Sequence, residues 1–221
     1  MKQKQENQNA LGQASESEHE PLSFRDIQVP AELVEKGLHH TAEGLSGMFG
    51  RNILLTNVRQ SLIPIEEALD GIDDLEAPVA GIYLEGTGDM PSQFMLMIPL
   101  KMAYRIVDTL LMQPPGTTTE LDDLGRSALA EVGNVATSLF LNEIADLTHT
   151  DTRPTPPSVV VDMLGAVLNV ILLPAGLEMD KILLIDADFQ CCSTTLNIWF
   201  WLIPDISNRI LSRKQEAVSH A

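Results

Sequence analysis

The order of predicted elements runs twice along this sequence, and this constrains the fold more than any other feature. Each half opens with a long helical stretch, at 31–50 and 120–147, and continues into apolar runs bounded by turn residues. The halves match best where FMLMIP precedes KMAYRI and FWLIP precedes DISNRI, two apolar strands that each end in Ile-Pro. Two copies of about 85–90 residues are too few for a solenoid, so we expect them to share one core.

The predicted fold is therefore of the α/β (α+β) class, an internally duplicated domain built on a pseudo-two-fold β-sheet. Residues 1–27 are rich in Gln, Glu, Ser and Asn and are predicted to form a disordered tail. The elements expected in the second half are listed in chain order: a helix at 158–172, a strand at 181–189 and a strand at 194–204. The predicted domain spans 28–205, with repeats at 28–113 and 118–205, and a C-terminal helix and tail follow at 206–221.

The composition excludes several classes of function. The chain has 31 Asp and Glu against 14 Lys and Arg, a net charge of -17, and no Lys/Arg cluster in its sequence. Such a chain repels phosphate backbones and anionic membrane surfaces, so no nucleic-acid partner is expected. Its longest apolar stretch is interrupted by Asp162 and Asn169, which predicts no membrane insertion. The absence of a signal-peptide core and of a disulfide framework predicts a cytoplasmic protein.

The helix at 120–147 carries a polar stripe. Ser127, Glu131, Asn134 and Ser138 are spaced by four, three and four residues, which places them within a narrow arc of the helix. A solvated face is the ordinary explanation of such a stripe, but Asn is a poor residue for a helix interior. Gly133 also lies in mid-helix at a cost of about 1 kcal/mol relative to Ala, which predicts a close approach to the helix there.

This pattern resembles the signature of the CheC, CheX and FliY phosphatases of chemotaxis. The matching residues are Ser127, Glu131 and Asn134, followed 23 positions later by Pro157. EVGNVATSLFLNEI also resembles the family's usual E-I-G-N helix. The similarity covers about residues 28–205, and it implies a CheC-like fold with two long helices on one face of the sheet.

Family members carry the motif once or twice, with one copy per half. Aligning the two opening helices on Glu-x-Gly places Glu35 opposite Glu131 and Leu38 opposite Asn134. The first half thus keeps a carboxylate but lacks the amide, and Pro64 is the candidate remnant of its geometry. We therefore predict one active site in the second half and a degenerate site in the first.

The resemblance implies a phosphatase for the aspartyl phosphate of a CheY-like response regulator. Asn134 is expected to position the attacking water, because a neutral amide can donate and accept without adding negative charge. Glu131 is expected to pair with a lysine of the receiver. Ser127 and Pro157 are expected to support the helix surface and the adjoining loop. No cofactor of its own is expected, since the receiver supplies Mg²⁺.

Other interpretations remain open at this point. His40 and Glu43 lie three residues apart, but two ligands are too few for a metal site, and an ordinary helix surface is favoured. The main alternative function is a non-enzymatic adaptor that binds the receptor deamidase CheD, or a scaffold component of the flagellar switch. A monomer is mildly favoured over a dimer, because a duplicated chain forms a pseudo-dimer by itself.

Overall fold

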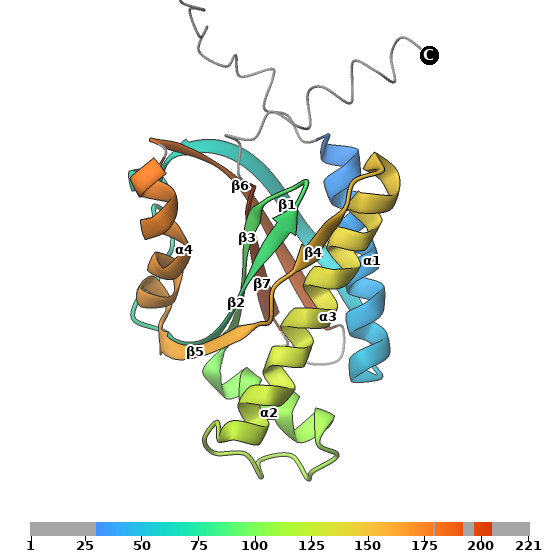
Figure 1. Cartoon of the computed structure of the whole chain (residues 1–221). Coiled ribbons are helices and arrows are strands. Elements are labelled where there is room, and N and C mark those ends of the chain that lie inside the picture. Colours follow the sequence, from blue (N-terminus) through green and yellow to red (C-terminus); the bar gives the residue numbers. More distant parts are fainter. Residues whose placement is uncertain (1–29, 179, 192–196, 205–221) are drawn as a thin grey trace, which may run out of the picture.

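The computed structural model describes residues 30–178, 180–191 and 197–204. These residues form one seven-stranded antiparallel sheet with helices on both faces (Figure 1). The strands follow the order β1-β6-β7-β3-β2, and the outer edge of β2 pairs with both β4 and β5. In chain order the strands are β1 (Ile53–Pro64), β2 (Pro78–Gly88), β3 (Ser92–Pro99), β4 (Thr152–Pro154), β5 (Ser158–Met163), β6 (Lys181–Cys191) and β7 (Asn197–Pro204).

The strand order is symmetric about the centre of the sheet, where β3 of the first half pairs with β7 of the second. Moving outward from this pair, β2 corresponds to β6, and β5 corresponds to β1. However, β1 pairs with β6 and β5 pairs with β2, so each half donates its first strand to the other. The predicted duplication is present as a pseudo-two-fold sheet, and the exchanged strands join the halves into one domain.

The helices are divided unequally between the two faces of the sheet (Figure 1). The first face is covered by three helices, which bury the larger of two apolar clusters. The second face is covered by one helix and a short 3₁₀ turn, which bury the smaller cluster. The helices of the first face are α1 (Ala31–Phe49), α2 (Leu100–Leu110) and α3 (Asp123–Thr148), and those of the second are η1 (Ile65–Glu67) and α4 (Leu164–Glu178). The two long helices, α1 and α3, share one face as predicted.

Helices α1 and α3 run side by side in opposite directions (Figure 1). A side chain at Gly37 would overlap the ring of Phe140, so the glycine allows the two helices to approach closely. Near this contact the hydroxyl of Thr41 donates to the carbonyl oxygen of Ala136, 3.2 Å away, and so links the two helices. Beneath them lies a cluster of aromatic rings: Phe94, Phe140, Phe189 and Phe200.

The helix predicted over 158–172 is wrong in its first part. Residues Ser158–Met163 form β5, and only from Leu164 does the chain form α4. A continuous apolar run does not distinguish a strand from a buried helix, and the β-branched Val159–Val161 favour the strand once the edge of β2 is available. Helix α4 then lies against the sheet where Gly81 leaves room for Val167.

The Ile-Pro ends of β3 and β7 are not structurally equivalent, although they are the strongest local match between the halves. Ile98 belongs to the apolar cluster beneath α1, α2 and α3, whereas Ile203 belongs to the cluster beneath α4. Aligning the two Ile-Pro pairs therefore shifts one strand by a single residue, which exchanges its two faces. The duplication is correct, but this residue-by-residue alignment of its strands is not.

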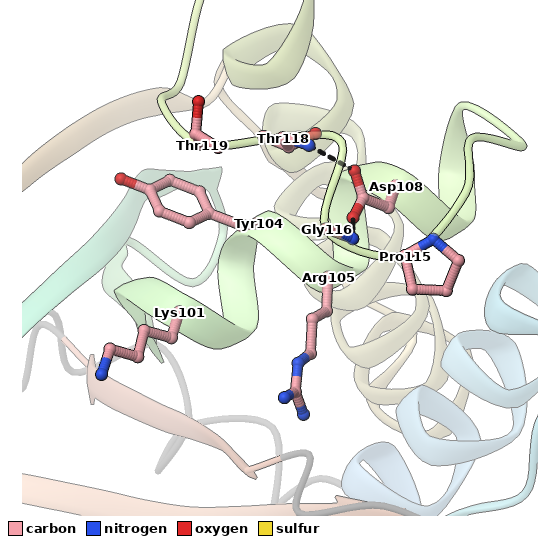
Figure 2. A pocket seen from close by; sticks show the side chains of 8 residues that line it. All are labelled: Lys101, Tyr104, Arg105, Asp108, Pro115, Gly116, Thr118 and Thr119. Carbon is pink, nitrogen blue, oxygen red and sulfur yellow. Dashed lines mark hydrogen bonds between the residues drawn. The ribbon is translucent and has the colours of Figure 1, made fainter.

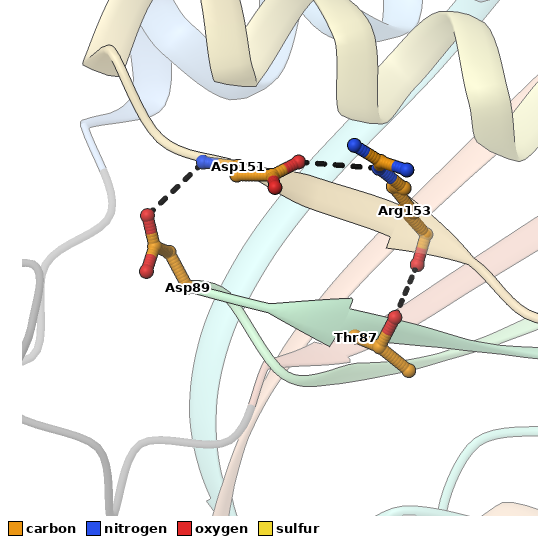
Figure 3. A network of polar contacts seen from close by, with 4 residues as sticks. All are labelled: Thr87, Asp89, Asp151 and Arg153. Atoms are coloured by element: carbon orange, nitrogen blue, oxygen red, sulfur yellow. Dashed lines mark hydrogen bonds and ion pairs between the residues drawn. The ribbon is translucent and has the colours of Figure 1, made fainter.

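The end of α3 is fastened to the end of β2 by polar contacts around Asp151 (Figure 3). The amide of Asp151 donates to a carboxylate oxygen of Asp89 at 3.0 Å, and the amide of Asp89 donates to the Asp151 carbonyl oxygen at 2.8 Å. Arg153 contacts the carboxylate of Asp151, and its carbonyl oxygen accepts a hydrogen bond from Thr87. These bonds fix where the chain leaves α3 and enters the edge of the sheet.

The tail predicted at 1–27 and the C-terminal helix predicted at 206–221 lie outside the described residues, so the structure does not test them. Across the described ranges, no helix combines the length and the apolar character needed to cross a bilayer.

Candidate functional site

The polar stripe lies on α3, and Gly133 allows this helix to pack closely against β2. A side chain at Gly133 would overlap Cγ2 of Ile82, so the close approach predicted at this glycine is the approach of α3 to the sheet. Val132 and Ala136 are fully buried beside it. With this face turned inward, Glu131 is exposed and Asn134 is half-buried at the surface of the helix.

Glu131 and Asn134 are separated by three residues, so their side chains are neighbours on the helix surface. Within the described part of the chain, neither side chain makes a hydrogen bond or an ion pair. The amide of Asn134 therefore presents both a donor and an acceptor at the surface, beside the carboxylate of Glu131. This pair has the chemistry to orient a small polar molecule and to contact a cation on another protein.

Ser127 lies one turn before Glu131, toward the start of α3, and it is exposed. Its hydroxyl donates to the carbonyl oxygen of Asp123 at 2.8 Å, four residues earlier. The helix begins after Asp122, whose carboxylate accepts a hydrogen bond from the amide of Gly125. The Ser127 hydroxyl is thus hydrogen-bonded within the first turns of the helix, and its supporting role stays a prediction.

Pro157 lies on the sheet edge that runs beside α3. Three residues, 155–157, separate β4 from β5, while only Leu84 and Glu85 separate their pairing positions on β2, so this edge contains a bulge. Arg126 donates to the carbonyl oxygen of Val159 at 3.2 Å, which ties α3 to the edge just beyond Pro157. Pro157 therefore lies in the bulge of the sheet edge, next to the point where Arg126 ties α3 to β5.

The degenerate site predicted in the first half is divided between the surface and the core. Glu35 is exposed on α1, but Leu38 is fully buried in the cluster beneath the helices. Pro64 ends β1, whereas Pro157 comes just before β5, the strand that corresponds to β1. Pro64 and Pro157 thus lie at opposite ends of corresponding strands, and Pro64 does not reproduce the position of Pro157.

Histidine and carboxylate side chains do meet between the long helices. Nδ1 of His40 lies 3.2 Å from a carboxylate oxygen of Glu143 on α3, so His40 contacts the other helix. No cluster of three or more metal-ligating side chains occurs among the residues that the structure describes. We therefore assign no metal ligands to this surface.

Two aspartates lie together on the opposite face of the sheet. Asp186 and Asp188 share one face of β6, and Arg59 donates to Asp186 at 2.8 Å. Burial raises the pKa of Asp188, and the neighbouring charge of Asp186 acts in the same direction. Asp186 is ion-paired with Arg59 across the strands, and we assign no catalytic role to the two aspartates.

Two features near α3 were not predicted. Leu124 is 57 % exposed and continues the stripe, since it lies three residues before Ser127. The sequence shows the spacing of three, four and three residues from Leu124 to Asn134. Leu124 was nevertheless left out of the predicted stripe, because the stripe was defined by polar residues. The second feature is a group of basic side chains around α2, Arg51, Lys101 and Arg105, which come from two separate parts of the chain.

The chain is 27 % identical over 188 residues to the CheY-P phosphatase CheC of Bacillus subtilis, a match covering 83 % of this chain and 90 % of that protein. This similarity supports the resemblance of the chain to the CheC, CheX and FliY family. The similarity to CheC accords with the Ser127, Glu131 and Asn134 pattern, although no protein-family model matches the sequence.

Solved structures of the CheC, CheX and FliY family share the fold. FliY of Thermotoga maritima superposes with a TM-score of 0.63 at 16 % identity, covering 89 % of this chain and 97 % of that one. CheX of Borrelia burgdorferi, solved in a complex with CheY, BeF₃ and Mg²⁺, gives a TM-score of 0.50 at 15 % identity. That match covers 78 % of this chain and 97 % of the other. At these identities the likeness establishes the CheC-like fold.

Proposed function

We propose that this protein accelerates hydrolysis of the aspartyl phosphate on a CheY-like receiver protein, using Glu131 and Asn134. The observation that carries the proposal is the presence of an amide and a carboxylate side by side on α3, at the surface and without partners in the described chain. The similarity to the CheY-P phosphatase CheC supports the substrate class. The existence of a solved CheX–CheY complex supports a receiver as the partner.

Asn134 orients the attacking water. Hydrolysis of an acyl phosphate needs a water molecule in line with the bond that breaks, and the receiver already holds the Mg²⁺ that balances the phosphoryl charge. The amide oxygen of Asn134 accepts a hydrogen bond from this water, and its NH₂ group donates to a second acceptor. Because the amide is neutral, it approaches the phosphoryl oxygens without repulsion. Rate acceleration then comes mainly from positioning.

Glu131 orients the complex. A carboxylate close to the phosphoryl group would repel it, so Glu131 acts at the edge of the reacting group, where it pairs with a lysine of the receiver. The two side chains are three residues apart, which sets the water and the lysine on neighbouring parts of one helix surface. Their roles are separate, and substitution of each residue should affect a different kinetic constant.

The test is phosphate release from a phosphorylated receiver, measured with wild-type protein and with Asn134→Ala. We expect the variant to lose acceleration by on the order of a hundredfold or more, because misplacement of a reacting group has effects of this size. Asn142→Ala is the matched control, since Asn142 is an exposed amide on the same helix. Glu35→Ala, on the corresponding helix of the first half, should also retain activity.

A full rate in the Asn134→Ala variant would refute the assigned mechanism. Binding of the phosphorylated receiver without any turnover by the wild-type protein would instead favour a non-enzymatic adaptor. The same assay repeated with added CheD tests whether that protein is a partner.

A further inference from the structure

The fold gathers basic side chains that are far apart in the sequence. Arg51 follows the end of α1, and Lys101 and Arg105 lie on α2; all three are exposed. They line two adjoining pockets, of about 490 Å³ and 300 Å³, that share Arg105, Asp108 and Pro115. We call these two pockets together the α2 groove. The sequence predicted no Lys/Arg cluster, because the cluster forms only when α1 and α2 are brought together.

The one acidic side chain that lines the α2 groove, Asp108, is hydrogen-bonded to a neighbouring loop rather than to the basic residues. Asp108 is only 2 % exposed, and its two carboxylate oxygens accept hydrogen bonds from the amides of Gly116 at 2.6 Å and Thr118 at 2.8 Å (Figure 2). It thereby holds the loop that forms one wall of the groove. Figure 2 shows Lys101 and Arg105 extending from α2 on the other side, away from this carboxylate.

The basic side chains of the groove have no competing partners in the part of the chain that is described. Neither Arg51, Lys101 nor Arg105 takes part in an ion pair there. By contrast, Arg59 is paired with Asp186 and Arg153 with Asp151. Within a protein of net charge -17, the lining of the groove therefore carries three unpaired basic side chains, while exposed acidic residues follow it at Glu120, Asp122 and Asp123.

The floor of the groove is partly apolar. Phe49, Met102 and Ile106 line the smaller pocket beside Arg51 and Arg105. The larger pocket adds hydroxyl groups, since Tyr104, Thr118 and Thr119 line it with Lys101 and Arg105. Basic side chains around an apolar floor suit an acidic protein surface that also presents apolar contacts.

The groove adjoins the candidate catalytic helix. Val107 of α2 packs beside Gly125 in the first turn of α3. Glu131 lies six residues farther along α3, or roughly 9 Å at 1.5 Å per residue. A typical partner covers about 800 Å² on each protein, a patch about 30 Å across. The groove and the stripe are therefore close enough along α3 for one partner to contact both, and the exposed Leu124 lies on the same helix.

We propose that the α2 groove binds the acidic surface of the receiver that surrounds its phosphorylation site. This inference rests on the proposed function. A receiver that holds Mg²⁺ and carries an acyl phosphate has carboxylates clustered on that face, because such oxygens are the ligands of Mg²⁺. The acidic globule would repel this face, and Arg51, Lys101 and Arg105 supply the local attraction that draws it toward Glu131 and Asn134.

The experiment separates binding from chemistry. Phosphate release is measured against receiver concentration for wild-type protein, Arg105→Glu and the double variant Lys101→Glu/Arg105→Glu, at low and high salt. We expect KM for the receiver to rise about tenfold in the double variant while kcat stays close to wild type. The wild-type KM should rise with salt, whereas that of the double variant should change little.

Lys181→Glu is the matched control, because it reverses an exposed basic residue at the start of β6, away from α2. An unchanged KM in the double variant, with normal wild-type turnover, would overturn the groove assignment and leave the proposed function intact. Equal rises of KM in Lys181→Glu and Arg105→Glu would also overturn it, because net charge alone would then explain the effect. A wild-type protein without turnover would remove the proposed function and this inference with it.

Discussion

Helices α1 and α3 occupy corresponding places in the two halves, yet they present different surfaces. Each has a buried glycine followed four residues later by a fully buried threonine, Gly37 and Thr41 in α1 and Gly133 and Thr137 in α3. In α1 the glycine accommodates the other helix, whereas in α3 it accommodates the sheet. Because the corresponding glycines face different neighbours, α1 and α3 expose different sides to solvent.

The residue that follows each glycine, Leu38 in α1 and Asn134 in α3, differs in burial as a result. Leu38 is fully buried, while Asn134, at the corresponding alignment position, is half-buried at the surface. An amide in place of Leu38 would point into the core, so the first half lacks both the amide and the orientation that would expose it. The first half thus differs from the second in the rotation of its helix as well as in residue type.

The largest stability effect is expected from an attempt to restore the first site with Leu38→Asn. The substitution removes a fully buried leucine and places an amide among apolar side chains, which should cost about 3–5 kcal/mol. Chemical denaturation measures this loss. Phosphate release should not rise above the wild-type rate; a stable variant with increased turnover would contradict the rotation described for α1.

A smaller effect is expected where α3 meets the sheet. Gly133→Ala places a methyl group against Ile82, and overpacking should destabilise the fold by about 1–3 kcal/mol. Gly47→Ala on α1 is the matched control, since a side chain there meets no neighbouring atom. This control should stabilise the fold by up to about 1 kcal/mol, because glycine is a poor residue within a helix. Thermal denaturation of both variants distinguishes tight packing at Gly133 from a mere propensity effect.

The third effect depends on pH and lies in the loop between the halves. Hydrogen bonds from the Thr118 hydroxyl and from backbone amides lower the pKa of Asp108 below 3.8, although burial acts against them. Because the folded-state pKa is lowered, the ionised carboxylate stabilises the fold above the unfolded pKa, and this stabilisation is lost as the pH falls through the folded value.

Asp108→Asn should therefore have a lower Tm than wild type at pH 7, and the difference should shrink below pH 3.8. Melting curves at pH 7, 5 and 3 measure it. A Tm difference that stays constant over this range would mean that the charge of Asp108 does not stabilise the loop.

The elements that were predicted correctly are those whose sequence signal is local. The helical spacing of Ser127, Glu131 and Asn134 required only one helix, and duplication was visible in the order of elements. The strand at Ser158–Met163 was missed because this segment forms a strand only when it can pair with the free edge of β2. The basic groove was missed because Arg51 and Arg105 come together only in the folded chain. Side-chain burial at Leu38 likewise depends on tertiary packing.

The exchange of β1 and β5 between the halves has a consequence for synthesis. Ile53, at the start of β1, pairs with Cys191 near the end of the sheet. During translation β1 has no neighbour until β6 has emerged from the ribosome, more than a hundred residues later, and pairing between such distant segments is slow. Newly made chains therefore hold β1 unpaired while β2 to β5 are synthesised, a period in which chaperones have a target.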